Sequence, residues 1–131
     1  MKKYEIKEEG IDIDVYVPYF SDLGISIDRI LSSTITIEGI KVPKPEVLLL
    51  LKLRAFTARA QSIKGKKDAI DIVNLLYAVE IDVKKLCDLG GGQTANNLRG
   101  LISAFSEVEY TPMDWREFIK FKRDMLKKLK C

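Results

Sequence analysis

Two prolines, Pro43 and Pro45, divide this chain into a front part that is typical of strands and a longer part that is typical of helices. Proline ends a strand because it lacks an N–H, and Pro45 is well placed to begin a helix. Because strands come first and helices after, we expect an α+β fold. Two short hairpins, antiparallel or mixed, would occupy residues 1–44, and a helical half would occupy residues 45–131 of a single domain.

The first predicted hairpin spans residues 4–17 and turns at Glu9-Gly10. In its second strand, apolar residues alternate with Asp12 and Asp14, which places both carboxylates on one face. The remaining predicted segments follow in chain order. They are a helical turn over 27–31 capped by Ser26, a hairpin over 34–42 with its turn at Glu38-Gly39, and helices over 46–59, 66–79, 82–89, 94–105 and 114 to about 130.

Local signals set the expected character of these helices. The Leu48–Leu51 run covers every side of its helix, so we expect the first turns to be buried all round. Thr94 is the expected N-terminal cap of its helix, Asp82 is expected to open the helix before it, and Asp114 is expected to precede the last helix. The triple glycine at 90–92 has neither a preceding strand nor a Lys-Ser/Thr signature, so it indicates a helix terminator rather than a phosphate loop. Residues 61–65 are expected to form a loop.

Composition excludes several classes of site. The chain of 131 residues contains no histidine, which removes imidazole catalysis and histidine-ligated metals. Its two cysteines, Cys87 and Cys131, indicate a reducing cytoplasm and argue against a disulfide scaffold or a structural zinc site. No apolar run approaches the roughly 20 residues needed to span a bilayer, and the N-terminus lacks a signal-peptide core. The abundance of Lys, Glu and Ile fits a heat-adapted source.

The helical half contains two candidate functional features, a pair of cations and a Lys-Asp segment. Lys52 and Arg59 are seven residues apart and therefore lie within about 20° of each other around one predicted helix. A cation on a buried, leucine-rich helix is costly unless it meets an anion. Lys67 and Asp71, one helical turn apart, belong to the next predicted helix.

Strand carboxylates near a buried lysine suit phosphoryl or nucleotidyl transfer. Asp12 and Asp14 could hold Mg²⁺, the hard cation that oxygen ligands prefer, while Lys52 neutralises charge that grows on phosphate. Each feature also has a structural interpretation. The aspartates could form a solvated strand face, Lys52 could pair with Glu46 or extend out of the core, and Lys67 with Asp71 could be a surface pair.

The segment from Pro45 to Ala55, followed by Arg59 and by the run from Lys67 to Ile72, resembles the second half of abortive-infection-type nucleotidyltransferases of the DNA polymerase β-like superfamily. The resemblance covers roughly residues 11–80. It implies that Lys52 contacts the nucleotide triphosphate and that Asp71 supports this lysine. The full implied set is Lys52 and Asp71 as catalytic residues, Lys52, Arg59 and Lys67 as nucleotide contacts, and Asp12 and Asp14 as metal ligands.

The chain departs from that family at its start. The family opens with a Gly-Ser or Gly-Gly turn before its Asp-x-Asp strand, and no such turn precedes residue 11. The front half is thus missing, lost, or supplied by another chain. We expect a partial or divergent nucleotidyltransferase of the toxin–antitoxin type that transfers a nucleoside monophosphate from NTP to a protein or RNA acceptor, and that is inactive alone. Its expected partners include a second copy or a complementing chain.

A rival hypothesis assigns the chain to non-catalytic binding. In the last predicted helix, basic residues form one stripe opposite Trp115, Phe118, Met125 and Leu129. Such a face could dock nucleic acid or an acidic partner protein, or it could simply be a solvated face over a packed stripe. The basic residues of the stripe are Arg116, Lys120, Arg123, Lys127 and Lys130.

Overall fold

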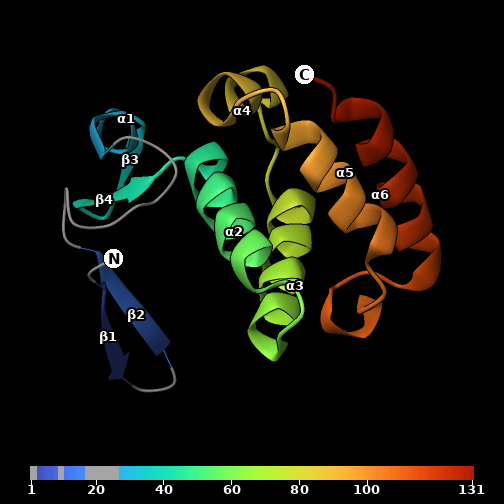
Figure 1. Ribbon diagram of the computed structural model, residues 1–131, viewed down its shortest axis with the longest axis horizontal. Helices are drawn as coiled ribbons and strands as arrows, with labels where there is room; N and C mark the ends of the chain where they lie inside the picture. The colour runs from blue at the N-terminus through green and yellow to red at the C-terminus, as the bar shows by residue number, and fades with distance from the viewer. Residues whose placement is uncertain (1–2, 9–10, 17–26) are drawn as a thin grey trace.

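The computed structural model describes residues 3–8, 11–16 and 27–131, and it shows the predicted α+β architecture, with hairpins first and helices after (Figure 1). Strands β1 (Lys3–Glu8) and β2 (Ile11–Tyr16) pair antiparallel, with Ile6 opposite Ile13. The predicted Glu9-Gly10 turn and the Ser26 cap lie outside the described residues.

The second hairpin follows α1 (Ile27–Ser32) and has the predicted turn. Strands β3 (Thr34–Ile37) and β4 (Ile40–Pro43) pair antiparallel, and both turn residues have positive φ, 50° at Glu38 and 81° at Gly39. Two consecutive positive φ angles are what a tight two-residue hairpin turn requires. The hairpin leaves isoleucine side chains exposed on its strands, since a two-stranded sheet covers little of its own surface.

The helical half contains five α-helices and one 3₁₀ turn within the described residues. Apolar side chains from all of these elements meet in one core. Fully buried members include Leu49 of the first helix, Ile72 of the second and Leu98 of the fourth. The elements are α2 (Pro45–Arg59), α3 (Ile63–Ala78), α4 (Val83–Gly90), α5 (Thr94–Ala104), η1 (Val108–Tyr110) and α6 (Trp115–Lys128).

Helices α2 and α3 form a tight hairpin that sets the position of the candidate site. The structure begins α3 at Ile63, inside the stretch that we expected to be a loop. The hydroxyl of Ser62 accepts a hydrogen bond from the Gly65 N–H at 3.1 Å, which caps the helix early. A Cβ on Gly65 would overlap the carbonyl oxygen of Arg59, so only glycine permits this close approach.

Two of the three predicted helix starts are confirmed, and in each of them the aspartate is the N-cap. Asp82 accepts from the Lys85 N–H at 3.1 Å, and Asp114 accepts from the Glu117 N–H at 2.8 Å. The Thr94 prediction is wrong, because Gln93 is the N-cap and Thr94 is already buried within α5. The triple glycine behaves as predicted, since Gly91 at φ 90° closes α4.

The expectation that the leucine run is buried on every side is also wrong. Leu48 is 37% exposed, whereas Leu49 and Leu50 are buried. Helix α2 packs against α3, α4 and α5, and the structure leaves the side that carries Leu48 open to solvent. Within the described residues, the structure contains no helix with the length and apolar character needed to cross a bilayer.

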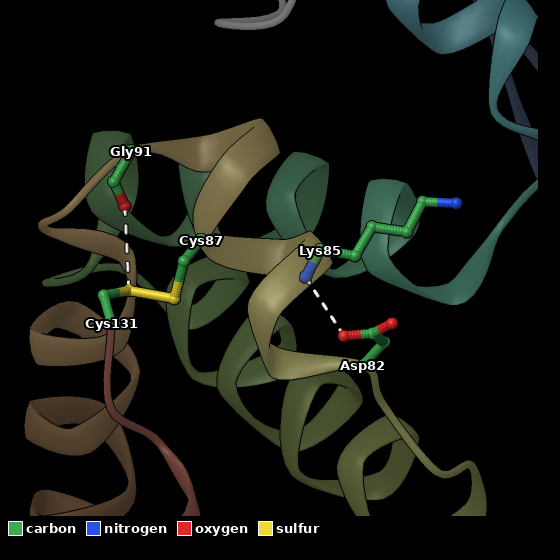
Figure 2. The surroundings of a disulfide bond; sticks show 5 residues. All are labelled: Asp82, Lys85, Cys87, Gly91 and Cys131. Carbon is green, nitrogen blue, oxygen red and sulfur yellow. Dashed lines mark hydrogen bonds between the residues drawn. A yellow bond between two sulfur atoms is a disulfide. The ribbon is translucent and has the colours of Figure 1, made fainter.

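A disulfide joins α4 to the chain end. Cys87 and Cys131 are bonded, with their Cα atoms 5.6 Å apart, and Cys131 Sγ lies 3.9 Å from the carbonyl oxygen of Gly91 (Figure 2). This bond contradicts the expectation of a chain without disulfide cross-links. A cysteine count could not show that the segment after α6 folds back onto α4, as it does in Figure 1. The cytoplasmic location stays a prediction.

Candidate functional site

An ion pair links α2 to α3 at the predicted lysine. Lys52 Nζ lies 3.0 Å from Asp71 Oδ2, and each side chain is 38% exposed. Of the anions considered from the sequence, the structure thus pairs Lys52 with the carboxylate that the family resemblance implies. The pair lies at the surface of the helix hairpin, where solvent and ligands reach both groups.

A second, more buried pair lies further along the same hairpin. Arg59 Nε donates to Asp68 Oδ2 at 2.7 Å, and Arg59 Nη2 donates to Asp68 Oδ1 at 3.0 Å. This two-point contact is strong and directional, and the Asp68 carboxylate is only 4% exposed. Asp68 lies in the run from Lys67 to Ile72 that carries the family resemblance, but the resemblance gave it no role.

A simple signal could have identified Asp68. Two helices joined by a short turn run antiparallel. A residue close to the turn on α2 therefore meets a residue close to the turn on α3, and residues far from the turn meet each other. Lys52 and Arg59 share one side of α2, while Asp68 and Asp71 are three residues apart and share one side of α3. The two cations therefore face the two carboxylates in order.

Lys67 does not join this cluster. It is exposed on α3, and within the described residues no ion pair connects it to Asp71, which faces Lys52 instead. The predicted surface pair between neighbours on α3 gives way to a pair between helices. Lys67 remains available to solvent anions beside the hairpin.

The two strand aspartates lie elsewhere. Asp12 and Asp14 belong to β2, where their Cα atoms pair with those of Lys7 and Glu5. Figure 1 shows the β1–β2 ribbon apart from α2 and α3. Among the described residues, no cluster of three acidic or cysteine side chains could hold a metal ion. The Mg²⁺ site stays a prediction.

The Lys52–Asp71 pair is chemically suited to hold an anion. An ammonium group has three N–H donors, and the contact with Asp71 uses one of them. The carboxylate fixes the direction of the lysine, while the half-exposed position leaves room for an incoming phosphate oxygen. The same pair could equally act as a structural link, since partly exposed ion pairs add up to about 1 kcal/mol of stability.

Helix α6 presents four residues of the predicted basic stripe, and the fifth, Lys130, follows the end of the helix at Lys128. All five cations are exposed, whereas Phe118 and Leu129 on the other side are buried. Trp115 departs from the expected packed stripe, because it is 59% exposed and contacts Phe118 edge-on with its ring. Arg123 has a carboxylate neighbour, Asp124, at 3.6 Å on the same helix.

No family model, curated protein or solved structure matches this chain. The resemblance to nucleotidyltransferases therefore depends on the residues quoted for it.

Proposed function

We propose that the α2–α3 hairpin is the phosphate-contacting part of a partial nucleotidyltransferase-like site. Lys52 would contact the triphosphate of an NTP, with Asp71 holding the ammonium group in position and Arg59 and Lys67 adding positive charge. Such donors lower the energy of charge that develops on phosphate during transfer. Completed by another chain, the site would transfer a nucleoside monophosphate to a protein or RNA acceptor. Asp12 and Asp14 stay the proposed ligands of Mg²⁺.

The observation that supports this proposal is the contact between Lys52 and Asp71 at 3.0 Å. Lys52 is 38% exposed, and its contact with Asp71 leaves two N–H donors for a phosphate oxygen. The order of Lys52, Arg59, Lys67 and Asp71 along the chain also follows the family that the sequence resembles.

The test is a thermal-shift titration with each NTP in the presence of Mg²⁺. A ligand at a hundred times its Kd adds about 2.7 kcal/mol of stability, which gives a visible shift. We expect one or more nucleotides to stabilise the wild-type chain and to lose this effect in Lys52→Met. Lys64→Met is the matched control, because Lys64 is an exposed lysine on α3 outside the proposed site.

Two outcomes would contradict the proposal. No shift with any nucleotide would mean that this chain does not bind NTP. An equal shift in wild type and Lys52→Met would mean that binding occurs away from the hairpin. A purely structural pair predicts instead that Lys52→Met and Asp71→Asn lower the melting temperature alike and leave nucleotide response absent.

A second candidate function is nucleic-acid binding by α6, and the exposure of all five basic side chains favours it. Contacts with phosphates make affinity fall steeply with salt. Charge reversal of Lys120, Arg123 and Lys127 should abolish salt-sensitive binding of single-stranded or duplex RNA in a gel-shift titration. Unchanged binding after reversal would exclude α6 as the contact surface.

Self-association is a third proposal, and it rests on the β3–β4 hairpin. Ile37 and Ile40 are more than half exposed there, and strand edges of a two-stranded sheet can pair with another chain. Sedimentation over a range of concentrations tests it. A monomer at every concentration would contradict it.

A further inference from the structure

A pocket of about 460 Å³ lies against α2, α3 and α5, away from the ion pairs described above. Its floor is apolar and includes Leu53, Phe56 and Phe105. Neither Lys52 nor Asp71 lines it. The volume falls within the range of pockets that hold small organic molecules, roughly 300–1,000 Å³.

Gly100 forms part of the pocket wall and has no packing reason to be glycine. It lies in the interior of α5, where glycine is a poor helix former. A Cβ at this position would meet nothing within 4 Å. At Gly65 and Gly90, by contrast, a Cβ would collide with neighbouring atoms. What glycine provides at position 100 is open space in the pocket.

The mouth of the pocket carries one ammonium group, two amides and one carboxylate. Lys66, Asn96 and Asn97 line it, and within the described residues their side chains take part in no hydrogen bond or ion pair that would occupy them. The carboxylate of Glu107, also at the mouth, already accepts a hydrogen bond from the Ser106 N–H at 3.1 Å. The available ammonium and amide groups suit a negatively charged end of a ligand.

We propose that this pocket binds a small organic monocarboxylate with a flat apolar body. The apolar body would lie on Phe56 and Phe105, and the carboxylate would meet the ammonium group of Lys66 and the amides of α5. Burial of the apolar body supplies most of the affinity, while the charged end fixes the orientation. This proposal does not depend on the nucleotidyltransferase function, because the two sites share no residue.

The experiment is a titration of the isotope-labelled full chain, followed by amide NMR shifts, with indole-3-acetate and with uncharged indole as probes. We expect saturable shifts on residues around Gly100, with a Kd on the order of 1 mM for a ligand of this size. Gly100→Leu fills the pocket and should weaken binding of both probes at least about tenfold, following the hydrophobic area lost. Ser103→Leu, on the same helix but outside the pocket, should leave both affinities unchanged.

Lys66→Met tests the charged end and keeps the proposal open to refutation if Gly100→Leu does not fold. It should raise the Kd for indole-3-acetate by about threefold or more, the size of effect that an exposed ion pair can give, and leave the Kd for indole unchanged. Lys64→Met should change neither. Non-saturating shifts for both probes, or full affinity in a folded Gly100→Leu chain, would overturn the pocket. Equal effects of Lys66→Met on both probes would overturn the carboxylate contact.

Discussion

Replacing Cys131 with serine removes the covalent link between the end of the chain and α4. The two cysteines are 44 residues apart in sequence, and the loop between them contains α5, η1 and α6. In the folded protein, the buried side chain of Leu129 still anchors this end of the chain. The substitution therefore acts mainly on the unfolded chain, which regains the freedom that the cross-link removes.

The size of the effect follows from the length of the closed loop. For 44 residues, the chain-entropy relation gives a loss of about 4 kcal/mol in the free energy of unfolding. Small domains have only about 5–15 kcal/mol in total, so this loss is a large fraction. With a urea slope of about 2 kcal/mol per molar, the midpoint should fall by about 2 M.

The measurement is urea unfolding of the air-oxidised protein, followed by circular dichroism with and without a reducing agent. The urea midpoint of wild type should fall on reduction. Cys131→Ser should have the midpoint of the reduced wild type, with or without the reducing agent. Cys87→Ser is the control for the other end and should behave identically. Two titratable thiols in the native air-oxidised protein, or a midpoint that is the same in wild type and Cys131→Ser, would refute the reasoning.

Three further predictions concern packing and charge. Gly65→Ala should destabilise the fold by roughly 1–3 kcal/mol in chemical denaturation, because the added Cβ overlaps the Arg59 carbonyl; a gain in stability would contradict the close approach. Leu98→Ala should cost about 2–5 kcal/mol, since Leu98 is fully buried, and a loss below 1 kcal/mol would argue against its place in the core. The pKa of Lys44 lies below its ordinary value of 10.5, chiefly through its hydrogen bond with Lys85 and then through the charge of Lys85. Between that lowered pKa and 10.5, the unfolded chain thus binds more protons than the folded chain, so the free energy of unfolding should rise with pH. Lys44→Met should reduce this rise, measured as the melting temperature against pH.

Local sequence determined much of the fold. Glu38-Gly39 can adopt positive φ and so predicts the hairpin turn, and Asp82 and Asp114 predict helix starts that the structure confirms. Each of these features depends on interactions between atoms within a few residues of one another, so it can be predicted from the local sequence. The local signal failed at Thr94, where the helix starts one residue earlier than predicted. The Thr94 N–H there donates to the Gly91 carbonyl at 3.2 Å and closes a turn that begins at Gly91.

The candidate site was only partly visible in the same way. Lys52 and Asp71 were identified from the resemblance, and the resulting contact is present. The partner of Arg59 was not identified, although the order of the two cations on α2 and of the two carboxylates on α3 points to Asp68 once the two helices are known to form an antiparallel hairpin. Asp12 and Asp14 lie on a strand that the structure keeps apart from that hairpin.

Tertiary structure alone decided the features that join distant segments. The bond between Cys87 and Cys131, the exposure of Leu48 and the pocket beside Gly100 all depend on how whole helices pack. Local sequence sets the preference of each short segment for a helix, strand or turn through backbone geometry and hydrogen bonding. Packing then selects which segments meet, because that choice is governed by the shape and burial of many side chains at once.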